Sequence, residues 1–188
     1  MQFRFLLVPG EKLWYTFPKG EIIMKFELKE LNMSMGQAEW EMYQDIPVKE
    51  PGSTNLCKGL PFEVFPAYLE SQIARKFLRI SYYDTPTTVC LMYVDDVPVG
   101  YIGIRTEIDE DWKRWSGNLY YTVRKSERGK GYGTKMAALA LEKCREMGMT
   151  EVFANASAGN VASARILEKN GGVFLKEVEG TRYYRFDL

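Results

Sequence analysis

One stretch of the chain, Tyr120–Thr134 (YYTVRKSERGKGYGT), combines residue types that can bind an anion. It begins with a β-type run, Tyr120–Val123, that is rich in aromatic and β-branched residues. Basic residues and glycines follow, and a helical spacing of apolar residues starts at Tyr132. The first turn of a helix has N–H groups without internal partners and carries partial positive charge. A strand, a glycine-rich turn and a helix in this order therefore predict a site for a phosphate or a similar anion.

The turn itself has the pattern R-x-x-G-x-G, in which Gly131 and Gly133 lack a Cβ and let a phosphate approach the backbone. Arg128 and Lys130 add full positive charges. The P-loop pattern G-x-x-x-x-G-K-[ST] does not occur in the chain. The dinucleotide pattern G-x-G-x-x-G fails because Met136 occupies its third glycine position. The alternative to an anion site is an ordinary strand-to-helix turn whose basic residues face water.

A second group of residues that could take part in catalysis is the acidic run Glu107–Asp111, which is followed by Trp112 and Trp115. One interpretation is a solvated loop. The functional interpretation is that the run helps to receive a cationic amine and that Glu107 or Asp109 deprotonates it. A relay of water molecules is the alternative base.

Composition excludes several classes of function. The chain of 188 residues contains no histidine, which removes the Ser-His-Asp and Cys-His mechanisms and most zinc sites, so no metal is expected. Lys+Arg 25 balances Asp+Glu 25, so no overall field favours nucleic acid or a membrane surface. No apolar run reaches the roughly 18 residues of a membrane span. Three scattered cysteines argue against a disulfide framework and indicate a reducing cytoplasm.

Periodicity predicts one α/β domain over residues 24–188, with no repeat or linker. The first helix is expected to begin at Ser34 as N-cap, with Gln37 completing a capping box, and to end at about Ile46. Further helices are expected over Pro61–Ile80, from Tyr132 to about Met147 and over Asn160–Lys169. Strands are expected over Lys25–Leu31, Thr88–Val94, Val99–Ile108, Leu119–Val123, Glu151–Ala156, Val173–Val178 and Thr181–Leu188.

Local chemistry adds detail to these elements. Residues 47–61 read as a loop, and Asn160 is a good N-cap for the last helix. Val152 and Phe153 predict a strand that is buried on both faces, and Val161 is a candidate for burial in the last helix. Cys144 falls at core spacing and is expected to be a buried hydrophobe rather than a nucleophile.

Residues 1–23 have no helical or alternating period and are not a good signal peptide. Lys19-Gly20-Glu21 can be encoded by a sequence that looks like a bacterial ribosome-binding site, just upstream of Met24. We favour the hypothesis that the native chain starts at Met24 and that residues 1–23 are a non-native or accessory extension. The alternative is an N-terminal hairpin that packs on the domain through Trp14, Tyr15 and Phe17.

Two motifs together resemble the GNAT N-acetyltransferase superfamily. The R-x-x-G-x-G turn resembles its acetyl-CoA pyrophosphate loop. Asn160, Ser163, Glu168-Lys169 and Gly171-Gly172 resemble its second signature, N-x-x-S-x-x-x-x-E-K-x-G. One helix, one strand and one turn separate the two motifs, as that fold requires. The resemblance covers residues 25–188, is strongest from Val99 onward, and points to a bacterial subgroup of predicted acetyltransferases.

The resemblance implies an α/β (α+β) fold with a mixed, mostly antiparallel central sheet that is flanked by helices. Its fourth and fifth strands, Leu119–Val123 and Glu151–Ala156, should splay apart and hold acetyl-CoA as cosubstrate. The residues implied in acetyl-CoA binding are Tyr121, Thr122, Val123, Arg128, Gly129, Lys130, Gly131, Tyr132, Gly133, Thr134, Asn160 and Ser163.

The resemblance also implies that an amine attacks the thioester directly in a ternary complex. A backbone N–H of the fourth strand would stabilise the oxyanion, a contribution of about 3 kcal/mol, and proximity would supply most of the rest. Many members carry a tyrosine on the last helix as general acid, but Leu167 occupies that position here. Tyr120 or Tyr121 could substitute, and we list Tyr121 as a candidate catalytic residue beside Glu107 and Asp109.

Two other functions are open at this point. One is a non-catalytic CoA-binding module that acts as a sensor or interaction surface, and the other is an acyltransferase with a different acyl-CoA or an aminoacyl donor. The acceptor could be a polyamine, an amino acid, an aminoglycoside or a protein N-terminus, and the acidic run favours a small cationic amine. We expect a cytoplasmic monomer or homodimer with no nucleic-acid or membrane partner.

Overall fold

A computed structural model gives the structure of the protein and describes residues 24–50, 52–77, 85–110, 113 and 116–188. It also describes the backbone of strands β1 (Leu6–Val8) and β2 (Lys12–Trp14). Several sequence-based predictions lie outside these residues: the helix end at Ile80, the turn from Tyr82, the acidic residue Asp111, and the aromatic residues Tyr15, Phe17, Trp112 and Trp115.

The order of elements from residue 24 onward follows the predicted order, except that two short strands lie between the first two helices. The strands are β3 (Lys25–Glu30), β4 (Lys49–Glu50), β5 (Ser53–Thr54), β6 (Thr87–Val94), β7 (Val97–Arg105), β8 (Leu119–Val123), β9 (Glu151–Ser157), β10 (Val173–Val178) and β11 (Thr181–Asp187). The helices are α1 (Gln37–Gln44), α2 (Phe65–Ala74), α4 (Tyr132–Glu146) and α5 (Val161–Lys169), with short 3-10 turns η1 (Phe62–Val64) and η2 (Lys125–Glu127).

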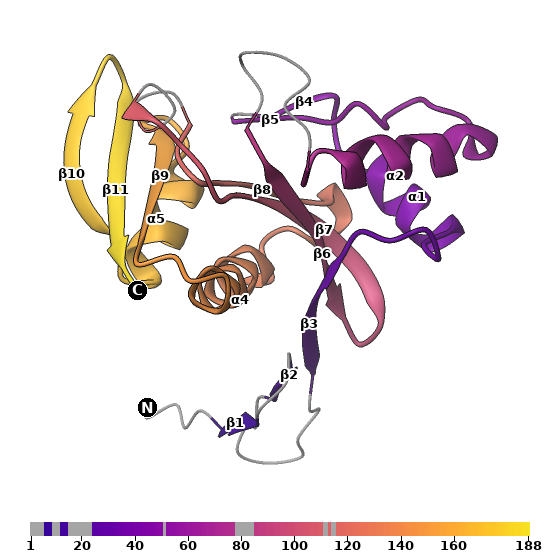
Figure 1. Cartoon of the computed structure of the whole chain (residues 1–188), viewed down its shortest axis with the longest axis horizontal. Coiled ribbons are helices and arrows are strands. Elements are labelled where there is room, and N and C mark those ends of the chain that lie inside the picture. The colour runs from indigo at the N-terminus through magenta and orange to yellow at the C-terminus, as the bar shows by residue number, and fades with distance from the viewer. Residues whose placement is uncertain are drawn as a thin grey trace.

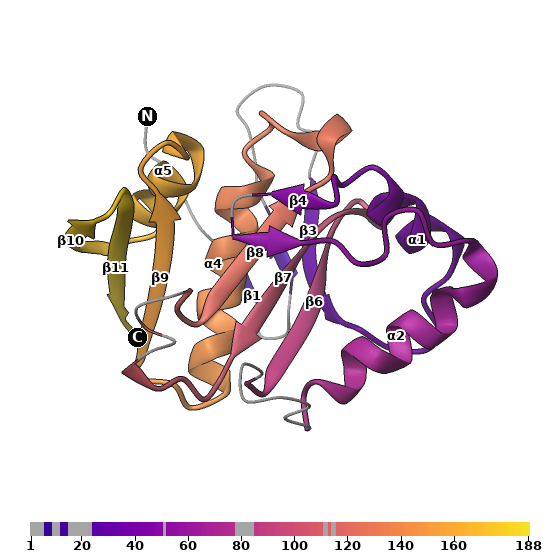
Figure 2. The same ribbon diagram turned by 90° about the horizontal axis from the view of Figure 1, so that it is seen from above.

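The two larger of the three sheets lie side by side in the molecule (Figure 2), and the third is the two-stranded sheet β4-β5. The larger has the strand order β1-β2-β3-β6-β7-β8, the smaller has the order β10-β11-β9, and every ladder described is antiparallel. Within the described residues, β8 and β9 share no ladder and are linked by one isolated bridge, Gly117↔Ala154. The predicted splay between the fourth and fifth strands of the domain is confirmed.

Asn118 joins the two sheets at one end of this gap. Its backbone N donates to Phe153 O at 2.7 Å, and its side-chain Oδ1 accepts from Phe153 N at 2.7 Å. Its Nδ2 donates to Arg105 O at 2.8 Å. The gap between β8 and β9 therefore widens away from Asn118, toward the ends of both strands.

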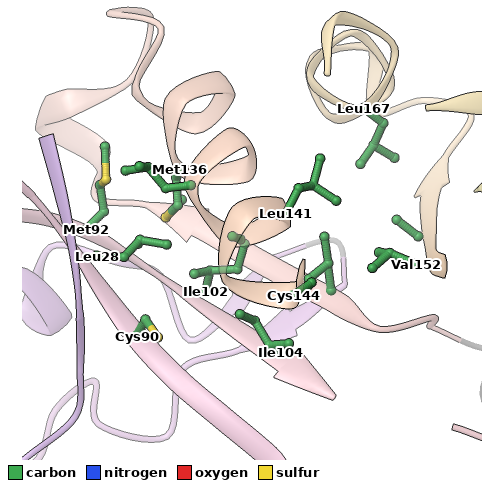
Figure 3. Packing of buried hydrophobic residues seen from close by; sticks show 14 of the residues in the cluster. Leu28, Cys90, Met92, Ile102, Ile104, Met136, Leu141, Cys144, Val152 and Leu167 are labelled. Carbon is green, nitrogen blue, oxygen red and sulfur yellow. The ribbon is translucent and has the colours of Figure 1, made fainter. Parts of the chain in front are cut away.

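Helices cover both faces of the large sheet: α1 and α2 lie on one face and α4 on the other (Figure 1). Because side chains alternate along a strand, β6 and β7 contribute side chains to two hydrophobic cores, one on each face of the sheet. Figure 3 shows the core under α4, which includes Met92, Ile102 and Met136 together with Cys144, a residue correctly predicted to be buried. The core under α1 and α2 contains Met42, Tyr43, Phe65, Leu91 and Tyr101.

The predicted start of α1 is wrong. Gly36, and not Ser34, is the N-cap, and the carboxylate of Glu39 accepts from the N–H of Gly36 at 2.7 Å. Ser34 instead donates to the side chain of Asn32. Residues 47–61, predicted as a loop, contain the short hairpin β4–β5. An Asx-type contact before the helix and a two-residue ladder leave little trace in hydrophobic periodicity.

Strand β9 and helix α5 show a second difference. Val152 is buried, but Phe153 is only half-buried, so β9 is not buried on both faces as predicted. Val161 in α5 is also exposed, contrary to prediction. The predicted N-cap is confirmed, because Asn160 Oδ1 accepts from Ser163 N at 3.1 Å. The small sheet thus has one open face, and its buried residues alternate along the strand.

The backbone of the N-terminal segment extends the large sheet. β1 pairs with β2, and β2 pairs with β3 through Leu13↔Phe26 and Trp14↔Lys25. Strand pairing does not identify a translation start, so the start at Met24 stays a prediction. None of the described helices is long and apolar enough to cross a bilayer.

Candidate active site

The edge of β8 that faces β9 forms no strand ladder within the described residues. Arg105 N donates to Asn118 O at 2.8 Å, and Arg124 N donates to Val99 O at 2.8 Å. In an antiparallel ladder, the groups of alternate residues point to opposite edges. The backbone groups of Tyr121 and Val123 therefore point into the gap, whereas those of Thr122 point toward β7.

A cavity of about 720 Å³ fills the gap between β8 and β9, and we call it the seam cavity. Lys130 is absent from its lining, but every other residue predicted to bind acetyl-CoA lines it. Sequence reasoning missed further lining residues, including Glu50, Asn155, Arg165 and Lys169. Arg165 and Lys169 lie five and nine residues after Asn160, so a helical spacing of three or four residues from Asn160 does not predict them.

The turn before α4 exposes backbone donors to the seam cavity. Gly129 and Gly131 have left-handed backbones with φ of 79° and 83°, which favours glycine. The consecutive N–H groups from Gly129 to Gly133 donate no hydrogen bond within the part of the chain that the structure describes. Thr134 N, in contrast, donates to Gly131 O at 3.1 Å. The available donors are thus the N–H groups of the turn and of the first residues of the helix, which is the arrangement that an anion site requires.

Tyr132 contributes to this turn through its backbone rather than its ring. The side chain is buried in the core, and its ring lies edge-on to Phe26 with centroids 6.0 Å apart. This contact fixes the start of α4 against β3.

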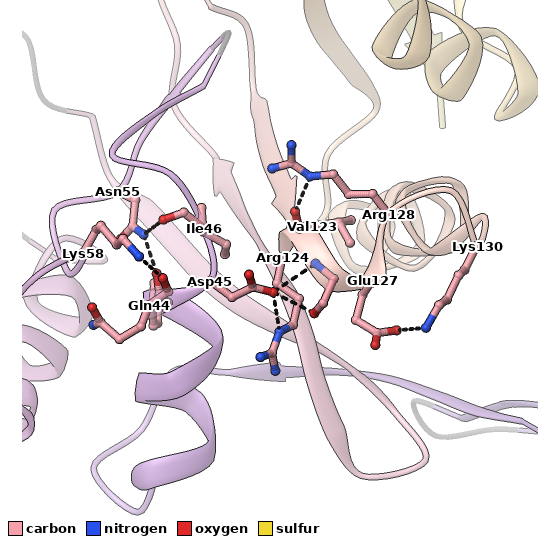
Figure 4. Close-up of polar contacts among 12 residues, drawn as sticks. Gln44, Asp45, Ile46, Asn55, Lys58, Val123, Arg124, Glu127, Arg128 and Lys130 are labelled. Atoms are coloured by element: carbon pink, nitrogen blue, oxygen red, sulfur yellow. Dashed lines mark hydrogen bonds and ion pairs between the residues drawn. The ribbon is translucent and has the colours of Figure 1, made fainter.

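Both basic residues of the turn are held by carboxylates. Lys130 Nζ lies 2.8 Å from Glu127 Oε2, and Arg128 Nη2 lies 3.0 Å from Glu50 Oε1. Arg128 Nε also donates to Val123 O at 2.9 Å (Figure 4). Arg128 thus spans from the end of β8 to the hairpin β4–β5 at the rim of the seam cavity.

A further carboxylate ties α1 to the same turn. Asp45 Oδ2 accepts from Ser126 Oγ at 2.7 Å, from Ser126 N at 3.0 Å and from Arg124 Nε at 3.1 Å (Figure 4). Burial by itself raises the pKa of Asp45, but the hydrogen bonds from Ser126 and Arg124 outweigh burial and hold this pKa below its usual value. The carboxylate thereby fixes η2 in front of the glycine turn.

Tyr121 reaches across the seam cavity to α5. Its hydroxyl lies 2.9 Å from Ser163 Oγ. Burial raises the pKa of Tyr121 to about 12, so the phenol stays protonated near neutral pH. Leu167, at the helix position where the resembling family often has a tyrosine, is buried in the core and does not line the cavity. Tyr121 is therefore the tyrosine that a ligand in the seam meets beside Ser163.

A second cavity of about 690 Å³ lies beside the hairpin β4–β5, the end of α2 and strands β7 and β8. We call it the hairpin cavity. Glu50, Gly52 and Tyr120 line both cavities, so the two meet at these residues. Gly103, the ladder partner of Tyr120, permits this arrangement, because a Cβ there would come within 2.1 Å of the Tyr120 ring.

The acidic candidates lie elsewhere. Glu107 and Asp109 are exposed and line neither cavity. The structure therefore does not bring the predicted bases to the seam. Within the described residues, no group of three or more Cys, Asp or Glu side chains could hold a metal ion.

A protein-family model described as "Acetyltransferase (GNAT) domain" matches residues 62–173, which is more than half of the chain. The chain belongs to the GNAT acetyltransferase family. A search of curated proteins found no matching sequence.

Solved structures of GNAT acetyltransferases share the fold. RimL, a ribosomal L7/L12 alpha-N-protein acetyltransferase in complex with coenzyme A, has a TM-score of 0.62 at 12% identity, over 87% of this chain and 94% of its own. YncA of Salmonella typhimurium, a putative acetyltransferase with acetyl-CoA, has a TM-score of 0.56 at 16% identity, over 86% and 93%. Ribosomal-protein-alanine N-acetyltransferase of Brucella melitensis has a TM-score of 0.58 at 19% identity, over 86% and 99%.

As a GNAT acetyltransferase, the protein is an enzyme that uses acetyl-CoA as acetyl donor. The seam cavity suits this ligand: it lies between two strand edges, and its lining includes a turn whose N–H groups and Arg128 can bind phosphate.

Proposed function

We propose that this GNAT acetyltransferase transfers the acetyl group to a primary amine by direct attack in a ternary complex. The observation that carries the proposal is that the seam cavity and the hairpin cavity meet at Glu50, Gly52 and Tyr120. A donor in the seam and an amine in the hairpin cavity can meet there. Holding both reactants in place removes much of the entropic barrier.

The side chains give little support to a covalent acetyl-enzyme. The sequence has no histidine to activate a serine or a cysteine. Cys57, Cys90 and Cys144 are buried and line neither cavity. Burial raises the pKa of the Cys57 and Cys144 thiols to about 11, which keeps them protonated.

We assign donor binding to the seam. The N–H groups of Gly129 to Gly133 and the guanidinium of Arg128 bind the pyrophosphate. The backbone groups of Tyr121 and the N–H of Val123 pair with the pantetheine arm, because Val123 O already accepts from Arg128 Nε. An N–H of this edge stabilises the oxyanion. Asn160 uses Oδ1 to cap α5, so its Nδ2 is the group that can donate to the same arm.

We assign the proton transfers to Glu50 and Tyr121. Among the described residues, Glu50 is the carboxylate that lines both cavities, and it accepts the proton of the attacking amine. A nitrogen–carbon bond forms, the carbon–sulfur bond breaks, and the leaving thiolate takes a proton from Tyr121. We choose Tyr121 because its hydroxyl reaches across the seam cavity beside Ser163 and is protonated near neutral pH.

Three measurements test the proposal. Acetyl-CoA and free CoA should raise the melting temperature, whereas ATP and NAD should not; at a hundredfold excess over the dissociation constant the gain is about 2.7 kcal/mol. Intact-mass analysis after incubation with acetyl-CoA alone should show unmodified protein. Initial rates with an amine should give intersecting double-reciprocal lines. An acetylated protein that passes its acetyl group to an added amine would contradict direct attack.

A further inference from the structure

The hairpin cavity carries an excess of positive charge. Of the described residues that line it, Lys49, Arg75 and Arg105 are cationic, and Glu50 is the one carboxylate. Glu50 already forms an ion pair with Arg128, a residue that does not line the hairpin cavity. A field of this sign attracts anions and repels cations.

Arg75 at the end of α2 has neutral partners. Its Nη1 donates to Gln72 Oε1 at 3.1 Å and to Tyr120 Oη at 3.4 Å. No carboxylate pairs with this half-buried guanidinium within the described part of the chain. A guanidinium has five N–H donors, and these two contacts engage one nitrogen atom. Arg75 can therefore bind a carboxylate or a phosphate with its remaining donors.

Arg105 adds charge behind Tyr120. It is 8% exposed, and its Nη1 donates to Gly117 O at 2.9 Å and to Ser116 Oγ at 3.2 Å. Its Cζ lies 4.6 Å from the centre of the Tyr120 ring. Burial lowers the pKa of Arg105 to about 10, so the group remains cationic at neutral pH.

Tyr120 therefore stands between two guanidinium groups, with Arg105 at its ring and Arg75 at its hydroxyl. Tyr120 also borders the seam cavity. Positive charge thus lies next to the junction at which the amine must react, and this charge would repel a cationic acceptor. An acceptor with its own anionic group would supply the counter-charge.

We propose that the acceptor is an amine that carries an anionic group, a carboxylate or a phosphate, and that Arg75 binds this group while the amine faces Glu50 at the junction. The inference rests on the proposed amine acetylation and deepens it by naming the acceptor class. It replaces the cationic acceptor expected from the acidic run, because Glu107 and Asp109 line neither cavity.

Matched pairs of amines test the proposal. β-Alanine against propylamine isolates a carboxylate, O-phosphoethanolamine against ethanolamine isolates a phosphate, and putrescine represents cationic acceptors. With saturating acetyl-CoA and detection of released thiol, the anionic member of at least one pair should have at least tenfold higher kcat/KM than its neutral-tailed partner and than putrescine. The pair that shows the preference identifies which anion is recognised.

Variants assign the preference to Arg75. Arg75→Gln should abolish it with the KM for acetyl-CoA unchanged, and Arg75→Lys should restore part of it. Arg145→Gln is the matched control, because Arg145 is exposed on α4 and lines neither cavity. Circular dichroism and melting curves of each variant check that the fold is retained.

The outcomes separate this inference from the proposed function. Failure of both CoA species to bind would refute the proposed function itself. Binding of CoA together with equal or faster acetylation of propylamine, ethanolamine or putrescine would overturn the anionic acceptor alone. If none of the amines reacts, β-alanine or O-phosphoethanolamine should still raise the melting temperature of the wild-type CoA complex and not that of Arg75→Gln. No such rise overturns the inference as well.

Discussion

Arg128 Nη2 lies 3.0 Å from Glu50 Oε1, and this ion pair connects the glycine turn before α4 to the hairpin β4–β5. In the proposed donor site, a pyrophosphate at the turn would compete with Glu50 for this guanidinium. Donor binding would then free the Glu50 carboxylate at the junction, so we expect the donor to bind before Glu50 accepts a proton.

Glu50→Gln tests this relationship. We expect kcat to fall about a hundredfold, as is typical for loss of a general base, while acetyl-CoA binds at least as tightly as to the wild type. Stopped-assay kinetics and calorimetric titration with CoA measure the two effects. Glu127→Gln is the control, since Glu127 also lines the seam cavity and pairs with Lys130 but does not reach the hairpin cavity. Equal loss of kcat in both variants would remove Glu50 from the base role.

Gly131→Glu should weaken CoA binding at least tenfold, because it puts a bulky negative side chain where the backbone faces phosphate. Gly148→Glu is a matched control: its φ of 79° resembles the 83° of Gly131, neither has an atom within 4 Å of an added Cβ, and Gly148 lies at the far end of α4. Both variants carry similar backbone strain, so their stabilities should fall alike. Titration with CoA should then separate them, and equal affinities would argue against the turn as phosphate site.

Tyr121→Phe should lower kcat about a hundredfold, the usual range for a general acid, with little change in the KM for acetyl-CoA. Since the pKa of Tyr121 is raised to about 12, the phenol is protonated at every pH from 6 to about 9. The shape of the pH profile of kcat should therefore be the same in the wild type and the variant. Tyr183→Phe on β11, outside both cavities, is the control. A wild-type profile that loses a limb in Tyr121→Phe would contradict the raised pKa.

Asp45→Asn should reduce the stability of the fold, because Asp45 accepts three hydrogen bonds from Ser126 and Arg124. For this partly exposed carboxylate we expect a loss of about 1 kcal/mol, which is about 2–4 °C in melting temperature for a chain of this size.

The effect should depend on pH with a defined sign. The folded-state pKa of Asp45 lies below its ordinary value of 3.8, so its contribution is complete above about pH 4 and is lost as the pH falls below 3.8 through the folded value. Melting curves of wild type and Asp45→Asn should therefore converge at low pH. Glu63→Gln, at an exposed residue of η1, should run parallel to the wild type throughout. A gap between wild type and Asp45→Asn that stays constant down to pH 2.5 would contradict this explanation.

Local patterns were enough to predict much of the lining of the seam cavity. Asn160 caps α5 as its residue type suggests, and the R-x-x-G-x-G turn lies at the start of α4 because glycine conformations and helical spacing are encoded in neighbouring residues. The fold followed from the same periodicities together with the resemblance of the two motifs. The exceptions, such as Gly36 in place of Ser34 as the N-cap, arise where several capping residues lie close together.

The acceptor side could not be predicted in the same way. Glu50 comes from a two-residue strand, Arg75 from the end of α2 and Arg105 from the last residue of β7. Tertiary packing alone brings these side chains to one cavity, and none belongs to a motif. The acidic run that begins at Glu107 was predicted to receive the amine because its residues are adjacent in sequence. Adjacency in sequence does not bring its described residues to the hairpin cavity.

The end at which Asn118 joins the two sheets has a consequence for how a long ligand enters. Its hydrogen bonds to Phe153 and Arg105 hold β8 and β9 together at one end, and no described ladder holds them at the other. A small change in the angle between the sheets opens the outer end of the gap without breaking a strand pair. In the proposed donor site, coenzyme A would therefore enter and leave sideways along the strand edges, and would not pass lengthwise through a closed tunnel.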